Sequence, residues 1–235
     1  MVYVTGDMHG DIERFSERKL KKLKAEDTLI ILGDFGFVWQ NTEEEKKNLE
    51  FISKRRFKTL FIDGTHENHK ALKEFPETEL FGGRVRSLGG NLYMLCRGEV
   101  YNIEDKKILA FGGGQSDDKE FRVEGKTWFE EELPSIEEIE NAKKNIENCG
   151  GVDYIVTHDA PHKLKTSFAA EITEKNRFDS FLDELMVSGK YKKWYFGRYH
   201  TDRKITRMQY AVYRGVVEIE TPEKKSFFKR IFKKK

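Results

Sequence analysis

Residues 2–10 read VYVTGDMHG, a short run of β-branched and aromatic residues that ends at a glycine and is followed by an aspartate and a histidine. Such a run predicts a strand over residues 2–5. Side chains two positions apart in an extended chain project to the same side, so Asp7 and His9 can reach one metal ion. The glycines on either side leave room around them. The stretch therefore predicts a strand that leads directly into metal ligands.

The same arrangement recurs at four further apolar runs, each followed by a polar cluster. These runs are 28–32 before Gly33-Asp34, 59–62 before Gly64-Thr65-His66-Glu67, 152–157 before His158-Asp159, and 193–196 before Gly197-Arg198-Tyr199-His200. In open α/β sheets, ligands bind at the carboxyl ends of the strands. One cluster alone fits a capped turn or a hydrogen-bonded histidine equally well, but five at successive strand ends predict a metal centre. Carboxylate and imidazole ligands suit Mn, Fe, Zn or Co.

Charged, amphipathic stretches alternate with the apolar runs, which is typical of strands feeding helices in an α/β layer structure. Helices are expected over 12–23, 43–55 and 135–148, the last with Ser135 as N-cap and Glu138 three positions later. Further strands are expected between 91 and 111 and as short runs over 205–208, 209–213 and 216–219. We expect these last three to be antiparallel strands that close one sheet.

Composition favours one large domain in a reducing compartment. The chain has 235 residues, is 37% hydrophobic and has a net charge of +2, but residues 221–235 hold seven Lys or Arg against one Glu. A mildly acidic body with a basic tail disfavours a nucleic-acid-binding domain. The two cysteines, Cys96 and Cys149, form no disulfide framework. Neither a signal peptide nor a membrane-spanning apolar run is present in the sequence, so a cytoplasmic location is expected.

The clusters match a family pattern in order, spacing and strand context. That pattern runs Gly-Asp-x-His, Gly-Asp, Gly-Asn-His-Glu, a lone His and Gly-His-x-His, so the chain resembles the calcineurin-like metallophosphoesterases. The segment from Phe111 to Ser135 is similar to that of small bacterial and phage members. The resemblance covers residues 1–220 and leaves 221–235 as a separate basic tail. It implies a four-layer α-β-β-α sandwich, two mixed β-sheets flanked by helices, that hydrolyses a phosphoric ester with a metal-bound hydroxide.

The resemblance also implies a role for each cluster. The first metal ion would be held by Asp7, His9, Asp34 and His200, and the second by Asp34 as the bridge, His158 and the positions of Thr65 and Arg198. His66 would protonate the leaving oxygen as the catalytic acid, and Glu67 would orient His66. These roles make the divalent ions the expected cofactors.

Two of the positions depart from the family pattern, and both belong to the second metal. Thr65 stands where the family has asparagine, and a hydroxyl is a shorter and poorer ligand than an amide oxygen. Arg198 replaces a histidine with a cation that has no lone pair to donate. A guanidinium near a divalent ion is repelled by about 4 kcal/mol per pair of unit charges at 4 Å and moderate dielectric. We therefore expect weak or absent occupancy of the second site.

Three functional hypotheses remain open. In the first, the enzyme works with one metal and Arg198 binds the substrate phosphate bidentately in a catalytic role. In the second, hydrolysis is largely lost, and the domain is an impaired phosphate-ligand-binding or regulatory protein. In the third, the two substitutions arose recently or were introduced in an active scaffold. All three predict a phosphorylated ligand, whose chemical class the motifs leave open.

Three further residues are candidates for substrate binding. Arg122 lies in the family-like loop from Asp117 to Gly125 and offers a planar fork for phosphate oxygens, although a surface salt bridge is an equal alternative. Thr65 lies beside the expected metal site. His69 falls three positions after His66, where a surface or helix-capping histidine is the alternative.

The tail over 221–235 has the pattern of a helix that begins at Thr221. Phe227, Phe228, Ile231 and Phe232 fall on one face among seven basic residues. This segment could lie on an anionic membrane surface or bind nucleic acid. The alternative is that the phenylalanines pack on the domain and leave the lysines in solvent.

Overall fold

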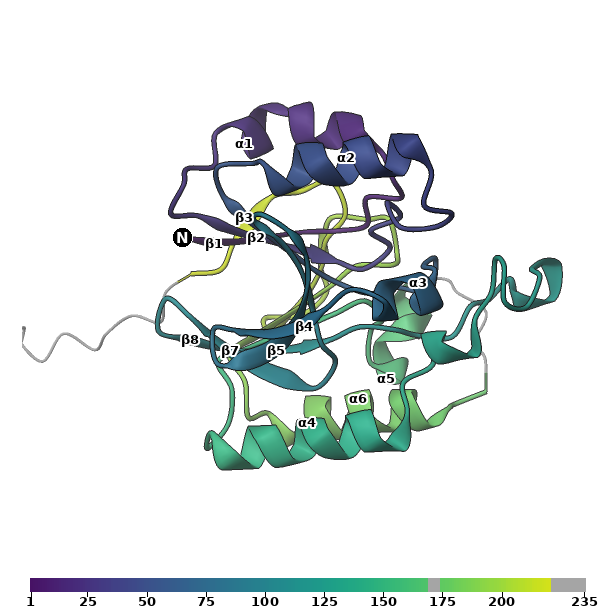
Figure 1. Cartoon of the computed structure of the whole chain (residues 1–235). Coiled ribbons are helices and arrows are strands. Elements are labelled where there is room, and N and C mark those ends of the chain that lie inside the picture. The colour runs from purple at the N-terminus through teal and green to yellow at the C-terminus, as the bar shows by residue number, and fades with distance from the viewer. Residues whose placement is uncertain (169–173, 221–235) are drawn as a thin grey trace, which may run out of the picture.

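The computed structural model describes residues 1–168 and 174–220. Two β-sheets face each other, and helices cover the outer face of each, as the layers of Figure 1 show. Both sheets contain parallel and antiparallel pairs. The predicted α-β-β-α sandwich with two mixed sheets is therefore confirmed.

The first sheet has seven strands in the order β13-β1-β2-β3-β6-β5-β4. They are β1 (Val2–Thr5), β2 (Thr28–Leu32), β3 (Lys58–Ile62), β4 (Glu77–Leu80), β5 (Gly83–Gly89), β6 (Leu92–Leu95) and β13 (Val217–Glu218). Strands β1, β2 and β3 are parallel neighbours, with Val4 opposite Ile30 and Ile30 opposite Leu60. Because parallel strands in register end at one edge, the polar clusters that follow them emerge together.

The second sheet has six strands in the order β11-β12-β10-β9-β8-β7. They are β7 (Glu99–Ile103), β8 (Lys106–Phe111), β9 (Tyr154–Thr157), β10 (Lys193–Phe196), β11 (Arg203–Lys204) and β12 (Gln209–Ala211). Strands β8, β9 and β10 are parallel, with Ala110 opposite Val156 and Val156 opposite Tyr195. The clusters that follow β9 and β10 therefore reach the same edge of the sandwich as those of the first sheet.

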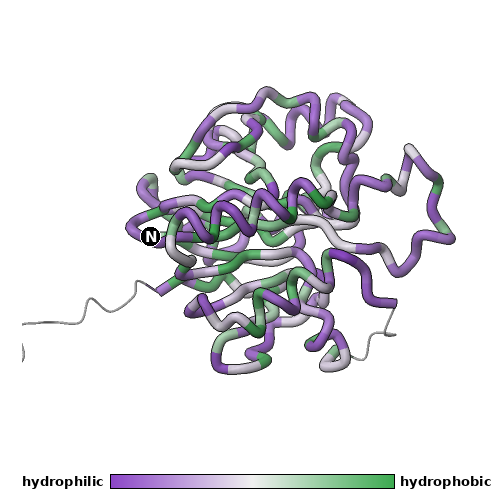
Figure 2. The backbone as a smooth tube through the Cα atoms, turned by 90° about the horizontal axis from the view of Figure 1, so that it is seen from below, coloured by the Kyte–Doolittle hydropathy of each residue, from purple (hydrophilic) through white to green (hydrophobic). Residues whose placement is uncertain are grey.

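Side chains alternate between the two faces of each strand, and they form three hydrophobic clusters. Val4 and Ile30 of the first sheet pack with Ile108 and Val156 of the second in the space between the sheets. The intervening side chains point outward and pack beneath the helices on either side. Figure 2 shows the hydrophobic colour concentrated on the inner strands. The strand ends are thus held by a continuous apolar interior.

In residues 1–168 and 174–220, helices cover the outer faces of both sheets, and further short helices lie near the strand ends (Figure 1). The covering helices are α1 (Arg18–Lys21) and α2 (Glu43–Ser53) on the first sheet, and α4 (Ile136–Asn148) and α6 (Arg177–Ser188) on the second; α3 (His69–Lys73) and α5 (His162–Lys165) are the short ones. The predicted capping box of α4 is confirmed, because the Ser135 hydroxyl accepts from the Glu138 N–H and the Glu138 carboxylate accepts from the Ser135 N–H.

The predicted continuous helix over 12–23 is wrong. A 3₁₀ helix spans Ile12–Ser16, and the four residues of α1 follow it. Asp11 caps the 3₁₀ turn by accepting from the Glu13 N–H at 3.1 Å. Glu17 then adopts an extended conformation, with φ −63° and ψ 146°, and separates the two pieces. The apolar spacing was near-helical, but local capping breaks the helix into two turns.

The prediction that the last strands close one sheet is also wrong. Strand β12 pairs in parallel with β10 of the second sheet, whereas β13 pairs antiparallel with β1 of the first. The crossing lies at 212–213, where the Val212 N–H donates to Phe196 and the Gly6 N–H donates to Tyr213. Helix α6 and the hairpin of β4 and β5 were not predicted.

Within residues 1–168 and 174–220, no helix is long and apolar enough to cross a membrane. The predicted helix at Thr221 and its membrane or nucleic-acid partners fall on 221–235, which lie outside the described residues. The described residues therefore test the predicted fold, and the helix over 221–235 stays a prediction.

Candidate metal centre

Four residues of the centre adopt a left-handed backbone immediately after the strand ends. His9, Asp34, Arg198 and His200 have φ values of 49°, 42°, 65° and 45°. This conformation is uncommon for residues other than glycine and is held only where the surroundings enforce it. The amides of Met8 and His9 donate to the Asp34 carbonyl at 3.0 and 2.8 Å, which ties the first two turns together. The turns direct their side chains toward one point.

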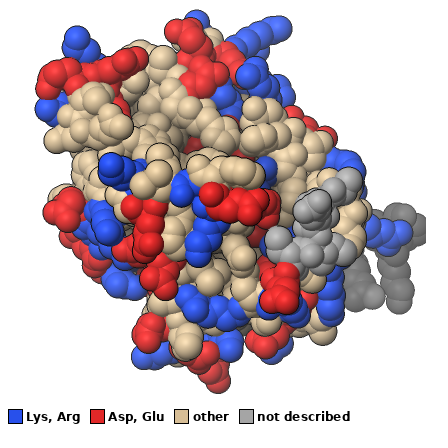
Figure 3. Space-filling view, turned by 90° about the vertical axis from the view of Figure 1, so that its right-hand side faces the viewer, with Lys and Arg blue, Asp and Glu red and all other residues tan. Residues whose placement is uncertain are grey.

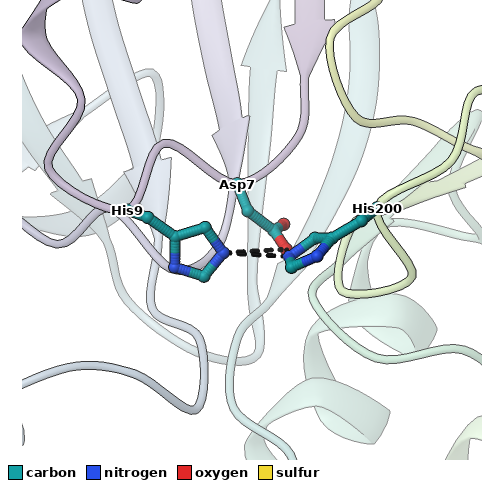
Figure 4. Close-up of side chains that lie close together, drawn as sticks. All are labelled: Asp7, His9 and His200. Atoms are coloured by element: carbon teal, nitrogen blue, oxygen red, sulfur yellow. Dashed lines mark hydrogen bonds and ion pairs between the residues drawn. The ribbon is translucent and has the colours of Figure 1, made fainter.

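Asp7, His9 and His200 meet at that point (Figure 4). Their potential ligand atoms all lie within 4.8 Å of one another. The two Nε2 atoms are 2.9 Å apart, and Asp7 Oδ2 lies 3.2 Å from His200 Nε2 and 3.9 Å from His9 Nε2. Burial lowers the pKa of His9, whereas the hydrogen bond to Asp7 raises that of His200. One carboxylate and two imidazole nitrogens thus converge as a divalent ion requires.

Asp34 joins this group to the histidine of the next turn. Its Oδ2 atom lies 3.9 Å from His9 Nε2 and 2.9 Å from His66 Nδ1, and its Oδ1 accepts from the His66 N–H at 2.8 Å. Burial by itself raises the pKa of Asp34, but His158 and His66 outweigh burial and lower it. Asp34 is therefore a carboxylate positioned between the two expected metal sites.

His158 supplies the clearest test of whether a metal fits. Its ring is fully buried, and Nδ1 lies 3.0 Å from the Leu32 carbonyl. Because a carbonyl can only accept, Nδ1 carries a proton, and in the neutral ring the lone pair lies on Nε2. Nε2 lies 3.4 Å from Asp34 Oδ1 and has no hydrogen-bond partner within the described part of the chain. A buried lone pair beside a carboxylate is a ligand atom suited to a cation.

Arg198 is held by acidic and carbonyl groups around it. Its backbone N–H donates to both Asp7 oxygens, at 3.0 and 3.1 Å. Its guanidinium contacts Asp159 Oδ2 at 3.3 Å, Asp117 Oδ2 at 2.9 Å and the Gln115 carbonyl. Burial raises the pKa of Asp159, but Arg198 and Lys165 reverse this and lower it. Arg198 thus enters the centre as an already neutralised cation, with several of its N–H groups in use.

Thr65 lies against the same wall as Arg198. A Cβ atom placed on Gly114 would lie 2.7 Å from Arg198 Nη1 and 3.1 Å from Thr65 Cγ2. Thr65 is 5% exposed, and its hydroxyl lies 3.2 Å from His66 Nδ1. The two positions that depart from the family pattern are therefore neighbours in space. Both lie beside Gly114, in the loop that follows β8 of the second sheet.

A comparison with known families agrees with this geometry. The family model of the calcineurin-like phosphoesterases matches residues 1–211. The chain belongs to this family. No match was found among curated proteins. The family is one of divalent-metal-dependent phosphoesterases, and the Asp7, His9 and His200 group lies where this calcineurin-like phosphoesterase would hold an ion.

Glu67 does not occupy the role expected for it. Its two carboxylate oxygens accept from the N–H groups of Phe35 and Gly36, while His66 is held by Asp34. Burial and the Asp34 carboxylate raise the pKa of Glu67 well above its ordinary value. Glu67 therefore positions the turn that carries Asp34. It follows the end of β3, and its side chain points inward to the backbone N–H groups of that turn.

His69 is neither a surface residue nor the cap of its helix. It is 4% exposed, its Nδ1 lies 3.5 Å from Asp63 Oδ2, and its ring meets Phe129 edge to face. Asn68 caps α3 instead, by accepting from the Ala71 N–H. Burial lowers the pKa of His69 to about 4. A ring enclosed in this way has no surface on which to bind substrate.

Arg122 reaches the centre from a distant loop. Its guanidinium contacts His66 Nε2, donates to the Thr65 carbonyl at 3.3 Å and pairs with Asp118 at 2.8 and 2.9 Å. The structure therefore brings Arg122 and His66 together, although they are far apart in sequence. The family-like pattern of the loop was the signal for this contact.

Two buried ion networks that support the centre were not predicted. Arg97 is buried and pairs with Asp63, with Nε at 2.9 Å from Oδ2. Asp159 accepts from Lys165 Nζ at 2.8 Å and from the Tyr199 hydroxyl at 2.6 Å. Asp159 directly follows His158, which was the one available signal. Partners from separate strands leave no pattern in the sequence.

Proposed function

We propose that this chain is an active phosphoesterase that uses one firmly held divalent ion, with Arg198 in place of a ligand to a second. The convergence of Asp7, His9 and His200 is the observation that carries the proposal. Asp34 completes the set, and manganese, iron, zinc or cobalt suits these ligands. The free thiols of Cys96 and Cys149 support a cytoplasmic location.

Each residue of the centre has a part in this proposal. Asp7, His9, Asp34 and His200 would hold the ion, and Nε2 of His158 would lie beside Asp34 on the side of the second position. A divalent ion bound there lowers the pKa of water and offsets the negative charge of phosphate oxygens. The centre supplies these ligands without rearrangement of the strands.

His66 is suited to protonate the leaving oxygen. Its Nδ1 is held by Asp34 at 2.9 Å, which fixes the ring and turns Nε2 away from the carboxylate. The His66 side chain is 43% exposed, so a substrate can reach it. The guanidinium of Arg122 donates to Nε2 in this structure, so it would have to move onto a phosphate oxygen before Nε2 could carry the proton. His66 thus moves the proton, and Arg122 binds and orients the ester.

The experiment is metal analysis combined with turnover of p-nitrophenyl phosphate. We expect about one manganese ion per chain and measurable hydrolysis. The Asp7→Asn variant should lose both, with an unchanged circular dichroism spectrum. Asp202→Asn is a matched control outside the proposed ligand set and should retain both. Metal bound at one per chain without any turnover would contradict the activity, and metal retained by Asp7→Asn would contradict the ligand set.

The second candidate is a phosphate-binding or regulatory protein of the same family. It is favoured by the guanidinium of Arg198 near Thr65 and Asp159, because a guanidinium opposes a second divalent ion. Restoring the family pattern with Thr65→Asn and Arg198→His together distinguishes the two. A rise from no turnover to turnover, with a second ion bound, would support this candidate. A wild-type rate that the double variant leaves within about twofold would support the one-metal enzyme.

A further inference from the structure

Residues 115–131 form a loop that projects from the body beside the metal centre (Figure 1, right). Its 3₁₀ turn spans Lys119–Phe121, and Arg122 follows at once. The Arg122 side chain turns back to His66, while its neighbours Phe121 and Val123 remain 83% and 55% exposed. The loop therefore presents one cation to the centre and two apolar side chains to solvent.

Arg122 is shared between the metal centre and a separate cavity in this loop. The cavity has a volume of about 400 Å³ and is lined by Lys119, Arg122, Glu124, Trp128 and Glu130. Because Arg122 contacts the nitrogen of His66 that faces the leaving oxygen, the cavity lies beside the leaving-group end of the site. A leaving group protonated by His66 would therefore lie next to this loop.

The walls of the cavity offer both donors and acceptors. Lys119 Nζ lies 4.0 Å from the centre of the Trp128 ring, and it forms no ion pair with any residue in 1–168 or 174–220. The Trp128 ring lines the same wall, but its indole N–H is buried and has no acceptor in those ranges. Glu124 and Glu130 bring two carboxylates to the same walls. Mixed donors and acceptors suit a group rich in hydroxyls or ring nitrogens, whereas a second phosphate would face both carboxylates.

We propose that the loop cavity is a leaving-group subsite for a nucleoside, so that the substrate is a nucleoside phosphate. This inference rests on the proposed phosphoesterase function and names the substrate class of that site. Lys119 and the two glutamates bind hydroxyl and base groups, and the exposed Phe121 ring, which precedes Arg122 in the loop, supplies a stacking surface for the base. The face that holds the strand ends carries interleaved positive and negative side chains (Figure 3). That mixture suits a mononucleotide better than a nucleic-acid polymer.

The test compares the binding of two probes by isothermal titration calorimetry, which needs no turnover. Wild-type protein should bind adenosine monophosphate at least tenfold more tightly than inorganic phosphate. Phe121→Ser and Lys119→Met should each lower the affinity for the nucleotide about tenfold and leave that for phosphate unchanged. Phe51→Ser, at a half-exposed phenylalanine of α2, is the matched control and should bind both probes as wild type does.

Equal affinity for the two probes in the wild type would overturn the subsite, whether or not p-nitrophenyl phosphate is hydrolysed. So would a serine-phosphorylated peptide that binds more tightly than the nucleotide and loses affinity in the Phe121→Ser variant. Conversely, nucleotide preference without hydrolysis would uphold the subsite and contradict the proposed activity. The two proposals can therefore fail separately.

Discussion

Individual residues of the centre are held in conformations that they would not adopt alone. His9, Asp34 and His200 each have a positive φ, which costs about 1–3 kcal/mol per residue. Hydrogen bonds between the turns and the buried ion pairs behind them offset that strain. The Asp63 carboxylate is one such support: Arg97 is bonded to it, and His69 lies close to it.

His69 makes the stability of the fold depend on pH. Its pKa of about 4 lies below the ordinary 6.5, so the unfolded chain takes up a proton that the folded chain refuses. The part of the free energy of unfolding that depends on His69 is therefore at its full value above pH 6.5. It falls by about 3 kcal/mol as the pH drops to 4. In His69→Gln that part of the fall should be absent. Urea denaturation at pH 7, 5.5 and 4.5 measures it.

Two comparisons separate the effect of His69 from that of other titrating groups. The comparison between wild type and His69→Gln at each pH cancels the carboxylates common to both proteins. At pH 7 the variant reports the loss of packing against Phe129 and the change in the contact with Asp63. Parallel losses of stability in the two proteins from pH 7 to 4.5 would contradict the assigned pKa.

At the scale of elements, the turns after the strands act as one unit. The turn that follows β2 carries Asp34 and is held from the turn after β3, because Glu67 accepts from the N–H groups of Phe35 and Gly36. The centre therefore depends on neighbouring strands ending in register. A change in one turn is transmitted to the ligand of the next.

The Glu67→Gln variant should weaken metal binding without unfolding the protein. An amide has one acceptor oxygen in place of two, so one of the two turn amides loses its partner. Supporting groups of this kind typically change metal affinity 10- to 100-fold. Titration calorimetry with Mn²⁺ measures the change, with Glu120→Gln on the exposed loop as the control. An unchanged affinity would show that Glu67 does not position Asp34.

Strand ends and ligand types could be predicted from the sequence because each depends on neighbours in the chain. Val2–Thr5 and Thr28–Leu32 match their predicted ranges, and the capping box at Ser135 follows from local spacing. The partners of Arg198 could not be predicted, since Asp117 and Asp159 come from two distant segments. The sheet to which β13 belongs could not be predicted either, because its two residues pair with β1, which lies at the other end of the chain.

At the scale of the whole molecule, the core between the sheets does not involve the metal ligands. Val4, Ile30 and Val156 are fully buried among apolar neighbours. The fold should therefore persist when the ion is removed, and only the edge of the sandwich should respond. Metal binding then adds stability by mass action alone.

Chelation should abolish hydrolysis and lower the melting temperature without loss of secondary structure. With free manganese at about 100 times its Kd, binding stabilises the folded state by about 2.7 kcal/mol. For a domain of this size that is a shift of about 5–10 °C. Differential scanning fluorimetry with EDTA and with added Mn²⁺ measures it. The Asp7→Asn variant should show no shift, and a shift of wild-type size in that variant would place the ion elsewhere.

The pairing of β13 with β1 and of β12 with β10 has a consequence for synthesis on the ribosome. The chain leaves the ribosome N-terminus first, whereas a domain generally folds as a unit. Asp7, His9 and Asp34 emerge early, but His200 and both closing strands come from the last stretch of the domain. The nascent domain therefore completes its fold only after its last strands have emerged, and His200, the last of the four proposed ligands, emerges shortly before them. The proposed metal centre is therefore complete only when the two sheets have been joined.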